Sequence, residues 1–423
     1  MTHDRPISFA LGQFATALAL ALFASGSAAD GKSLQYRIDY SLDLSVRPAI
    51  AELTVEQAGT ELRELAFVDN EERWSAFEAD GELTRNEGRW RWRVPAGGGT
   101  LRWNVAIDHR RGQAFDARRT ATWALFRGED VFPAMASRTV RGAESLARFR
   151  ATVPADWSFI SAFERTDDQY FRVDNPNRRF DRPTGWLLAG KRLGVRIERI
   201  GSGVVLIAAP AGQKVRRQDM LAFLNWSLPA MREALPNFPE RLLIVSANDP
   251  FWRGGLSGPA SLYVHADRPL ISENGTSTLM HELFHVGFRR PGATNDDWII
   301  EGLAEYYSVW LLRRSGSTTP RRFEKTLAEL ADWARSATGL RGPTSRGAVT
   351  ARAALVFHAL NREIESAHDG RRNLDHVVRR LAEQSGPVSL EELRTVAADV
   401  LGRPARTLSE LPFQALDTGE TSD

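Results

Sequence analysis

Two histidines and a glutamate in the stretch His281-Glu282-Leu283-Phe284-His285 have the types and the spacing that metal chemistry needs. On a helix, residues four positions apart lie on the same face, so the two imidazoles can bind one metal ion. The carboxylate of Glu282 can then act as a general base toward water. The flanking residues are apolar, which indicates a helix packed in a core rather than a solvated turn with incidental histidines. Because unpaired buried polar groups are costly, we interpret the polar stripe as a metal site.

A second polar pair lies on the next predicted helix. Asp296 and Asp297 suit the beginning of that helix, and Gly316 follows its last basic residues as a stop signal. Glu301 and Glu305 lie four positions apart on it and face the same way. Helices joined by a short loop usually pack antiparallel, which brings Glu301 back toward the histidines as a third metal ligand. We expect Glu305 to accept the hydrogen bond of a ligand imidazole and so to fix its tautomer.

The order of these motifs resembles that of the gluzincin metallopeptidases. The His-Glu-x-x-His stretch is followed by Glu301 in the pattern W-x-x-E-G-x-x-x-Y, which is similar to the glycyl aminopeptidase family and, more remotely, to the aminopeptidase N family. The substrate-binding strand of both families resembles an upstream segment made of Gly254, Gly255, Leu256 and Ser257. The resemblance covers residues 200–400. It implies zinc as the cofactor and a peptide or protein as the substrate.

The chain departs from the family pattern at two positions. The families carry a glutamate that binds the amino terminus of the substrate, where this chain has Ser257. They also carry an oxyanion-stabilising tyrosine in the motif Tyr-x-Lys-Gly-Ala, where this chain has Thr344 in the tyrosine position. Losing one oxyanion donor typically lowers turnover by about a hundredfold or more. Four residues remain candidates for that role, and the sequence does not choose among them: Arg346, His358, Tyr263 and His265.

The first residues predict export. An apolar run over 14–24 follows Arg5 and ends in small residues up to Ala29, which is typical of a secretory leader. We therefore predict a signal peptide over 1–29. The alternative, an uncleaved anchor, would need roughly 20 apolar residues to span a bilayer. We expect no stable membrane anchor after the leader is removed.

Composition narrows the compartment and the partners. The chain has no cysteine, so no disulfide stabilises it, which suits a bacterial periplasmic or secreted protein. Its 55 basic and 53 acidic residues nearly cancel and are scattered along the chain. No basic run interleaved with aromatic residues occurs, so we expect no nucleic-acid partner.

The chain changes in character near residues 201–203. Before that point, apolar residues alternate over 34–46, 90–94 and 101–107, which predicts half-buried strands of a β-sandwich. After it, the sequence predicts buried strands at 204–208 and 242–245 and an edge strand at 261–264. Helical periodicity predicts helices at 217–235, 321–337, 348–367, 374–384 and 390–400.

These patterns predict an α+β fold in four segments. The signal peptide at 1–29 is followed by a β-sandwich-like N-terminal domain at 30–201. Residues 202–406 form a thermolysin-like zincin catalytic domain with a helical C-terminal part, as the resemblance implies. Residues 407–423 form a polar tail.

The predicted function is zinc-dependent hydrolysis of peptide bonds by an exported, aminopeptidase-like metallopeptidase. Zn²⁺ is held by His281, His285 and Glu301, Glu282 is the general base, and the strand at 254–258 aligns the substrate backbone. Three alternatives remain open. The chain is an endopeptidase, a zinc-binding scaffold or chaperone with low turnover, or a sugar-binding protein built on the tryptophan-rich N-terminal half.

Overall fold

The described residues of the computed structural model are 34–166, 169–173 and 180–409. They combine four β-sheets with a helical C-terminal part, so the predicted α+β class is confirmed. The predicted signal peptide at 1–29 and residues 410–423 of the predicted tail lie outside the described residues. None of the helices in the described ranges has the length and apolar character needed to cross a membrane.

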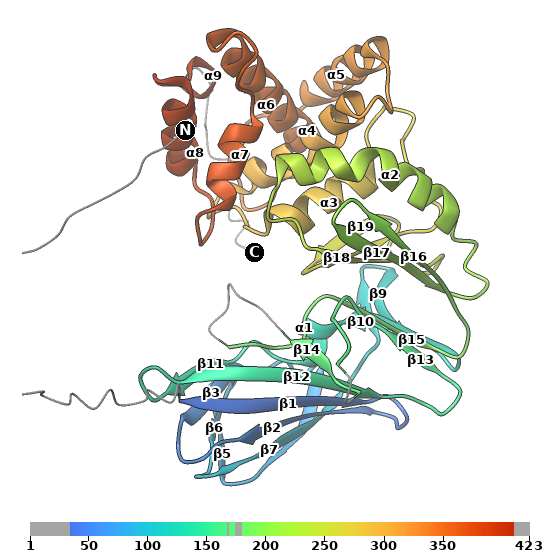
Figure 1. Cartoon of the computed structure of the whole chain (residues 1–423), viewed down its shortest axis with the longest axis vertical. Helices are drawn as coiled ribbons and strands as arrows, with labels where there is room; N and C mark the ends of the chain where they lie inside the picture. The colour runs from blue at the N-terminus through green and yellow to red at the C-terminus, as the bar shows by residue number, and fades with distance from the viewer. Residues whose placement is uncertain (1–33, 167–168, 174–179, 410–423) are drawn as a thin grey trace, which may run out of the picture. The chain divides into compact units, whose positions relative to one another are not determined.

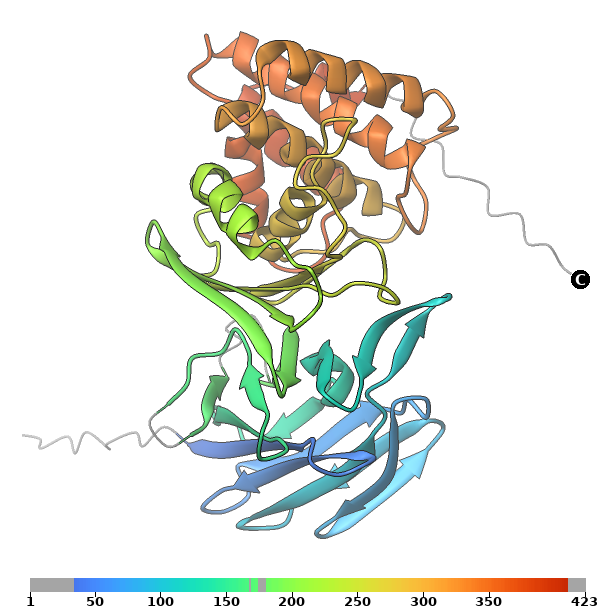
Figure 2. The ribbon, with the colours of Figure 1, turned by 90° about the vertical axis from the view of Figure 1, so that its right-hand side faces the viewer.

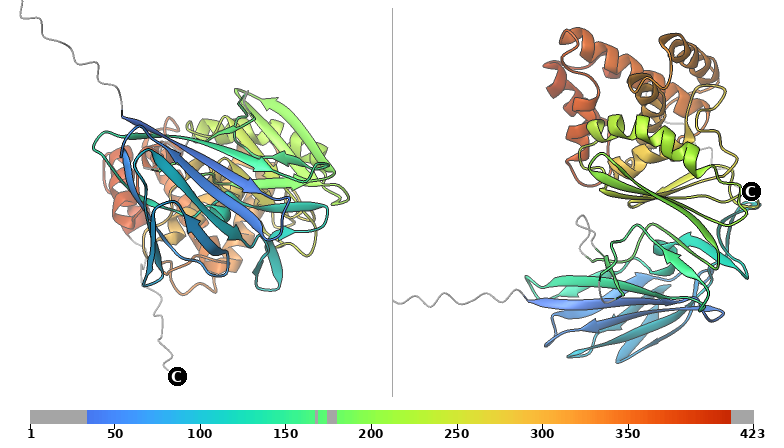
Figure 3. Two further views of the ribbon diagram at one scale, coloured as in Figure 1. Left: turned by 90° about the horizontal axis from the view of Figure 1, so that it is seen from below. Right: turned by 45° about the vertical axis from the view of Figure 1, so that its right-hand side comes forward.

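Two sheets in the first part of the chain share one core. The six-stranded sheet runs in the order β14 (Phe171–Val173), β12 (Glu144–Thr152), β1 (Gln35–Asp43), β2 (Ala49–Glu56), β7 (Gly98–Val105) and β4 (Trp74–Ala79), and Figure 3 shows it from below. The four-stranded sheet runs in the order β11 (Ala136–Thr139), β3 (Leu62–Val68), β6 (Arg89–Arg93) and β5 (Glu82–Asn86).

Aromatic side chains join these two sheets. The ring of Phe77 in β4 lies 5.2 Å from that of Phe67 in β3 and 4.9 Å from that of Trp90 in β6, measured between centroids. Trp92 and Trp103 are fully buried in the same core. Buried rings cannot form the exposed platform that carbohydrate stacking requires, so these tryptophans stabilise the sandwich instead.

A third sheet connects the sandwich to the rest of the chain. Its order is β13 (Ser158–Ile160), β15 (Trp186–Gly190), β10 (Trp123–Arg127), β9 (Ala114–Arg119) and β8 (His109–Arg111), and a short helix, α1 (Gly128–Val131), follows β10. Leu125 and Leu188 of this sheet share a buried cluster with Leu243 and Tyr263 of the fourth sheet. Trp186 donates from its indole nitrogen to the carbonyl of Leu256 at 2.9 Å. The third sheet therefore supports the segment that the sequence predicts to bind substrate.

The fourth sheet carries the helices of the site. Its order is β16 (Leu193–Ile200), β17 (Gly203–Pro210), β18 (Arg241–Val245), β20 (Ser261–Val264) and β19 (Gly255–Gly258). Helices α2 (Arg217–Ala234) and α3 (Thr278–Phe288) pack on it (Figure 1). The sheet is antiparallel at both margins and parallel from β17 to β20.

Two expectations about this sheet are corrected. The predicted edge strand, β20, lies inside the sheet because β19 pairs with its free side, so the edge is β19. The predicted domain boundary at residue 201 falls inside the hairpin of β16 and β17, so the change of sheet comes before Leu193. Both errors have one cause: strand pairing between separate segments decides which strand is outermost, and apolar patterning does not show it.

Six further helices complete the fold. They are α4 (Asp297–Arg314), α5 (Pro320–Ala334), α6 (Ala348–Ala367), α7 (Asp375–Ala382), α8 (Leu390–Leu401) and α9 (Arg406–Ser409). Side-chain caps set several of their starts: Thr319 caps α5 at Arg322, and Ser389 caps α8 at Glu392. Figure 2 shows α5 and α6 side by side above the sheet. Leu408 of α9 is buried, so the predicted tail at 407 begins inside this last turn.

Arg290, just after α3, forms hydrogen bonds to the C-terminal helical part. It is 7% exposed, and its guanidinium donates to both carboxylate oxygens of Glu392 at 2.7 and 2.9 Å. It also donates to the carbonyl of Gly386 at 2.8 Å. A buried guanidinium with this many acceptors fixes where α3 stops and where the loop to α4 starts.

We predict that Arg290→Leu lowers the free energy of unfolding by about 3 kcal/mol, because breaking a buried pair leaves the partner charge uncompensated. Urea unfolding followed by circular dichroism measures this. The control, Arg335→Leu, removes an exposed pair with Asp332 and should change the same quantity by less than about 1 kcal/mol. Equal losses in the two variants would contradict the structural role of Arg290.

Candidate active site

Helix α3 presents its histidines because the rest of its surface is buried. Ser277 caps the helix by accepting from the backbone N–H of Met280 at 3.3 Å, and Arg289 ends it in the left-handed conformation at φ 61°. Leu283 and Phe284 are fully buried in the core. This packing leaves the stripe with the two histidines to face the beginning of α4.

The three predicted metal ligands meet at one point. Nε2 of His281 lies 3.1 Å from Nε2 of His285, and these nitrogens lie 3.4 and 3.5 Å from the two carboxylate oxygens of Glu301. Zinc bound tetrahedrally at about 2.0–2.1 Å needs ligand atoms roughly 3.3 Å apart. The structure therefore brings His281, His285 and Glu301 together with the spacing that a tetrahedral zinc site requires.

Glu305 fixes how His281 presents its nitrogens. A carboxylate oxygen of Glu305 lies 3.1 Å from Nδ1 of His281, so Nδ1 carries a proton and donates it. The lone pair of Nε2 then faces the nitrogen of His285, and two lone pairs at this distance repel unless a proton or a cation lies between them. This arrangement fits a metal ion.

Burial and charge move the pKa values of the two histidines apart. Burial and then the positive charge of His281 lower the pKa of His285 to about 4, against the opposing charge of Glu301. Burial would also lower the pKa of His281, but hydrogen bonds to Glu301 and Glu305 hold it well above its ordinary value. At neutral pH His285 is therefore neutral, as a metal ligand must be.

Glu282 points from the same helix toward the edge strand. It is 8% exposed, and a Cβ on Gly255 of β19 would lie 2.4 Å from its Cγ, so only glycine allows this approach. Burial raises the pKa of Glu282, against the charge of His281 and hydrogen bonds from the side chain and backbone of Ser257. Ser257, at the position of the amine-binding glutamate of the families, therefore contacts the predicted general base.

Strand β19 is the edge at which an extended chain can add. Gly255, Leu256, Ser257 and Gly258 pair with β20, and the carbonyl of Gly254 accepts from the N–H of His265 at 3.0 Å just before the strand. The predicted substrate-binding residues thus lie beside Glu282 on one strand. An edge strand next to a catalytic helix can align a substrate backbone by β-pairing.

The structure separates the four candidates for the oxyanion role. Tyr263 is buried and donates to the carbonyl of Trp252 at 3.0 Å. His265 is 2% exposed and lies 3.4 Å from Asp249, and His358 packs between the rings of Tyr306 and Phe323. These contacts already engage the three side chains, so we exclude them from the oxyanion role.

Arg346 is the candidate that remains. Its side chain is exposed. Burial would raise the pKa of Glu301, but the hydrogen bond to His281 and nearby positive charges, including that of Arg346, lower it. Thr344, in the tyrosine position, is exposed two residues earlier.

A second cluster has metal-binding residue types but a different hydrogen-bond pattern. It consists of Asp249, His265 and Asp267. Nδ1 of His265 accepts from the backbone N–H of Asp267 at 3.2 Å, so in the neutral ring Nε2 carries the proton. Asp249 is engaged by Arg253 at 2.8 Å. His265 then presents an N–H rather than a lone pair at Nε2, and Asp249 is paired with an arginine, so this cluster is a weaker metal site than that of α3 and α4.

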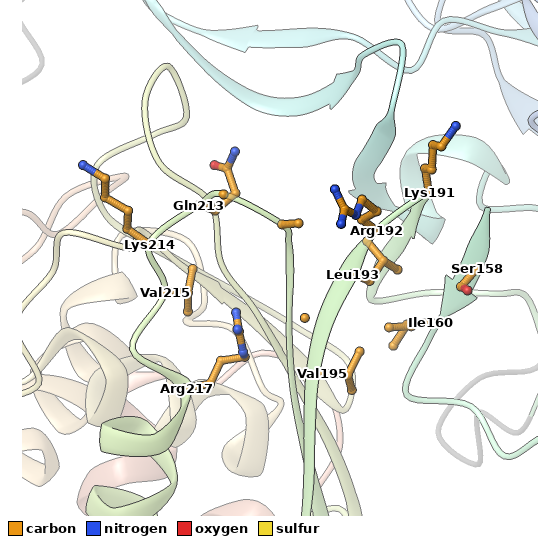
Figure 4. A pocket seen from close by; sticks show the side chains of 13 residues that line it. Ser158, Ile160, Lys191, Arg192, Leu193, Val195, Gln213, Lys214, Val215 and Arg217 are labelled. Atoms are coloured by element: carbon orange, nitrogen blue, oxygen red, sulfur yellow. The ribbon is translucent and has the colours of Figure 1, made fainter. Parts of the chain in front are cut away.

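Figure 4 shows a basic pocket of about 640 Å³ that shares no residue with the site on α3 and α4. Lys191, Arg192, Lys214 and Arg217 contribute its charge, and Lys191 is paired with Asp156 at 2.7 Å. The pocket contains none of the metal-binding residues, so it is not the candidate active site.

Comparisons with known proteins agree with this geometry. A family model described as M61 glycyl aminopeptidase matches residues 274–368, the segment with α3, α4, α5 and α6. The chain is similar to a solved aminopeptidase N family protein from Idiomarina loihiensis at 15% identity and a TM-score of 0.63, covering 82% of this chain and 70% of that one. It is also similar to an M1 zinc metallopeptidase from Deinococcus radiodurans at 18% identity and a TM-score of 0.53, covering 89% and 91%.

A third solved structure is aminopeptidase A from Legionella pneumophila in complex with aspartic acid, at 15% identity and a TM-score of 0.51. The match covers 92% of this chain and 50% of the aminopeptidase. No curated protein sequence matches the chain.

The fold and the segment that holds the site resemble those of known metallopeptidases. At these identities the solved structures show the fold alone, which is that of the M1 aminopeptidases. The family match adds the M61 glycyl aminopeptidases as the sequence resemblance of the site segment. The predicted resemblance is confirmed, and both comparisons support the prediction of a zinc metallopeptidase.

In the metal-free protein, we predict that His285 titrates at about 4 rather than at its ordinary value of 6.5. Its contribution to folding stability is then fully present above pH 6.5 and is lost as the pH falls through about 4. Nuclear magnetic resonance of the histidine ring signals after chelation measures the midpoint. His281→Gln removes the neighbouring positive charge and should raise the titration midpoint of His285. A wild-type midpoint near 6.5 would contradict the site electrostatics.

Proposed function

We propose that the chain is an exported zinc-dependent peptidase that holds one zinc ion with His281, His285 and Glu301. The observation that carries the proposal is the tetrahedral spacing of their ligand atoms, 3.1–3.5 Å, beside the buried carboxylate of Glu282. Strand β19, helix α3 and helix α4 follow one another as in a thermolysin-like zincin, which supports that finer assignment of the catalytic part.

The chain's own residues would supply the proton transfers and the alignment. When bound, zinc acts as a Lewis acid and lowers the pKa of water. Glu282 accepts a proton from the attacking water and passes it to the leaving amine, and its raised pKa suits both roles. Glu305 holds His281 in the metal-binding tautomer, and β19 aligns the substrate backbone.

The choice between exopeptidase and endopeptidase depends on Ser257. A hydroxyl does not balance the charge of a substrate's amino terminus as a carboxylate does. Ser257 is also occupied by Glu282. These contacts favour cleavage inside peptides over strict removal of the first residue, while the aminopeptidase-like neighbours support the general activity.

The predicted leader motivates the proposed compartment. Residues 14–24 and the small residues after them support export to a bacterial periplasm or medium, and the absence of cysteine is compatible with it.

A second candidate is a zinc-binding scaffold with low turnover. The exposed Thr344 in place of a tyrosine favours it, because a threonine hydroxyl is too short to replace the phenol without backbone movement.

We predict that Glu282→Gln abolishes peptide hydrolysis while the variant keeps about one zinc per chain, because the amide cannot accept the proton. Metal content is measured by mass spectrometry and turnover with a quenched peptide. His285→Ala should lose the zinc, and Glu273→Gln, an exposed glutamate on the same approach to α3, should change neither quantity. A wild type without zinc after purification with zinc present would contradict the site assignment.

Incubation with a diverse peptide library, with products identified by mass spectrometry, should reveal cuts inside the peptides, including peptides with an acetylated amino terminus. The reason is that Ser257 provides no charge for an ammonium group. Cuts restricted to the first residue of free peptides would instead establish an aminopeptidase. No cut by a zinc-loaded wild type would favour the scaffold.

A further inference from the structure

The loop before α6 is tied to the beginning of the helix that carries Glu301. Asp296, just before α4, accepts from Nε of Arg341 at 3.0 Å. Asp297, the first residue of α4, accepts from the backbone N–H of Ser345 at 2.8 Å. Asp297 lies four residues before Glu301, so the loop is fixed one helical turn from the metal-binding carboxylate. Arg346 follows directly after the second of these contacts.

Helix α6 approaches the same turn of α4. A Cβ on Gly302 would lie 2.4 Å from the Cβ of Ala353, so the two helices touch at the residue after Glu301. Gly347, the residue before α6, adopts φ 58° and provides no side-chain cap. The N-terminal end of this 20-residue helix therefore contributes its positive dipole end beside Arg346.

The guanidinium of Arg346 is available to a substrate. Its side chain is exposed, and within the described ranges it forms no ion pair within 4.0 Å, unlike Arg341 in the same loop. It directly follows Ser345, whose backbone N–H is bonded to the first residue of α4. An arginine next to a loop residue fixed to this helix, yet not committed to a carboxylate, can meet negative charge that develops on a substrate.

We propose that Arg346 stabilises the oxyanion of the tetrahedral intermediate, in the role for which Thr344 is too short. This inference rests on the proposed function. Water attacks the peptide carbonyl carbon, its proton moves to Glu282, and the π electrons of the C=O bond move to the oxygen that faces Arg346. The oxygen then re-forms its double bond, the C–N bond breaks, and the amine leaves with the proton from Glu282.

Kinetics of Arg346 variants test the proposal. Arg346→Ala should lower kcat by about a hundredfold with a small change in KM, since the interaction exists only in the transition state. Arg346→Lys keeps the charge without the planar fork and should lose less. Zinc content should remain about one per chain in both. The control, Arg362→Ala, removes an exposed arginine of α6, the helix that follows Arg346, and should leave kcat unchanged.

A tetrahedral inhibitor separates transition-state stabilisation from substrate binding. The affinity of a phosphinic peptide, whose anionic oxygens mimic the intermediate, should fall across the variants in proportion to kcat/KM. An effect confined to KM, a loss of zinc, or a kcat of Arg346→Ala within twofold of wild type would overturn the proposal while leaving the peptidase function standing. A zinc-loaded wild type that cleaves no peptide would instead overturn the proposed function itself.

Discussion

The interaction on which the site depends is the repulsion between the electron-rich atoms of His281, His285 and Glu301. The two Nε2 atoms lie 3.1 Å apart, and each lies 3.4 or 3.5 Å from one oxygen of Glu301. Proteins hold such atoms this close only when the surrounding structure enforces it or a cation compensates them. Here the buried surfaces of α3 and α4 hold these atoms close together, and so does the hydrogen bond that His281 donates to Glu305. The remaining helices and the edge strand are arranged around this concentration of polar groups.

The site is asymmetric, because the general base Glu282 and the exposed guanidinium of Arg346 lie on different elements. Glu282 is enclosed against β19, where only a glycine allows its approach, and Ser257 holds it there. Arg346 lies in the loop before α6, and a hydrogen bond from Ser345 to Asp297 fixes that loop to α4. The position that binds an amino terminus in related families is used here to position the base. Substrate choice and oxyanion stabilisation therefore depend on residues outside the metal-binding motif.

Much of the local architecture could be predicted. The alternation in β1 and the periodicity of α6 predicted those elements closely, because burial of one face imposes a period on the sequence. The strand at 254–258 was predicted by resemblance, but its position outside β20 and the boundary near 201 could not be predicted, since β19 has four residues with little apolar pattern and β16 pairs with a later strand. The four oxyanion candidates were equivalent in sequence, and the burial of Tyr263 and His265 and the ring contacts of His358 distinguished them from Arg346.

The sequence by itself determined the donor set: two histidines one helical turn apart, a carboxylate beside the first, and two glutamates on the next helix. Those features follow from covalent spacing and helical period, which act over a few residues. Only the tertiary structure decided that Glu305 fixes the tautomer of His281, that Ser257 contacts Glu282, and that Ser345, beside Arg346, bonds to Asp297 of α4. These contacts join residues up to about fifty positions apart, and the packing of whole helices and strands sets their distances.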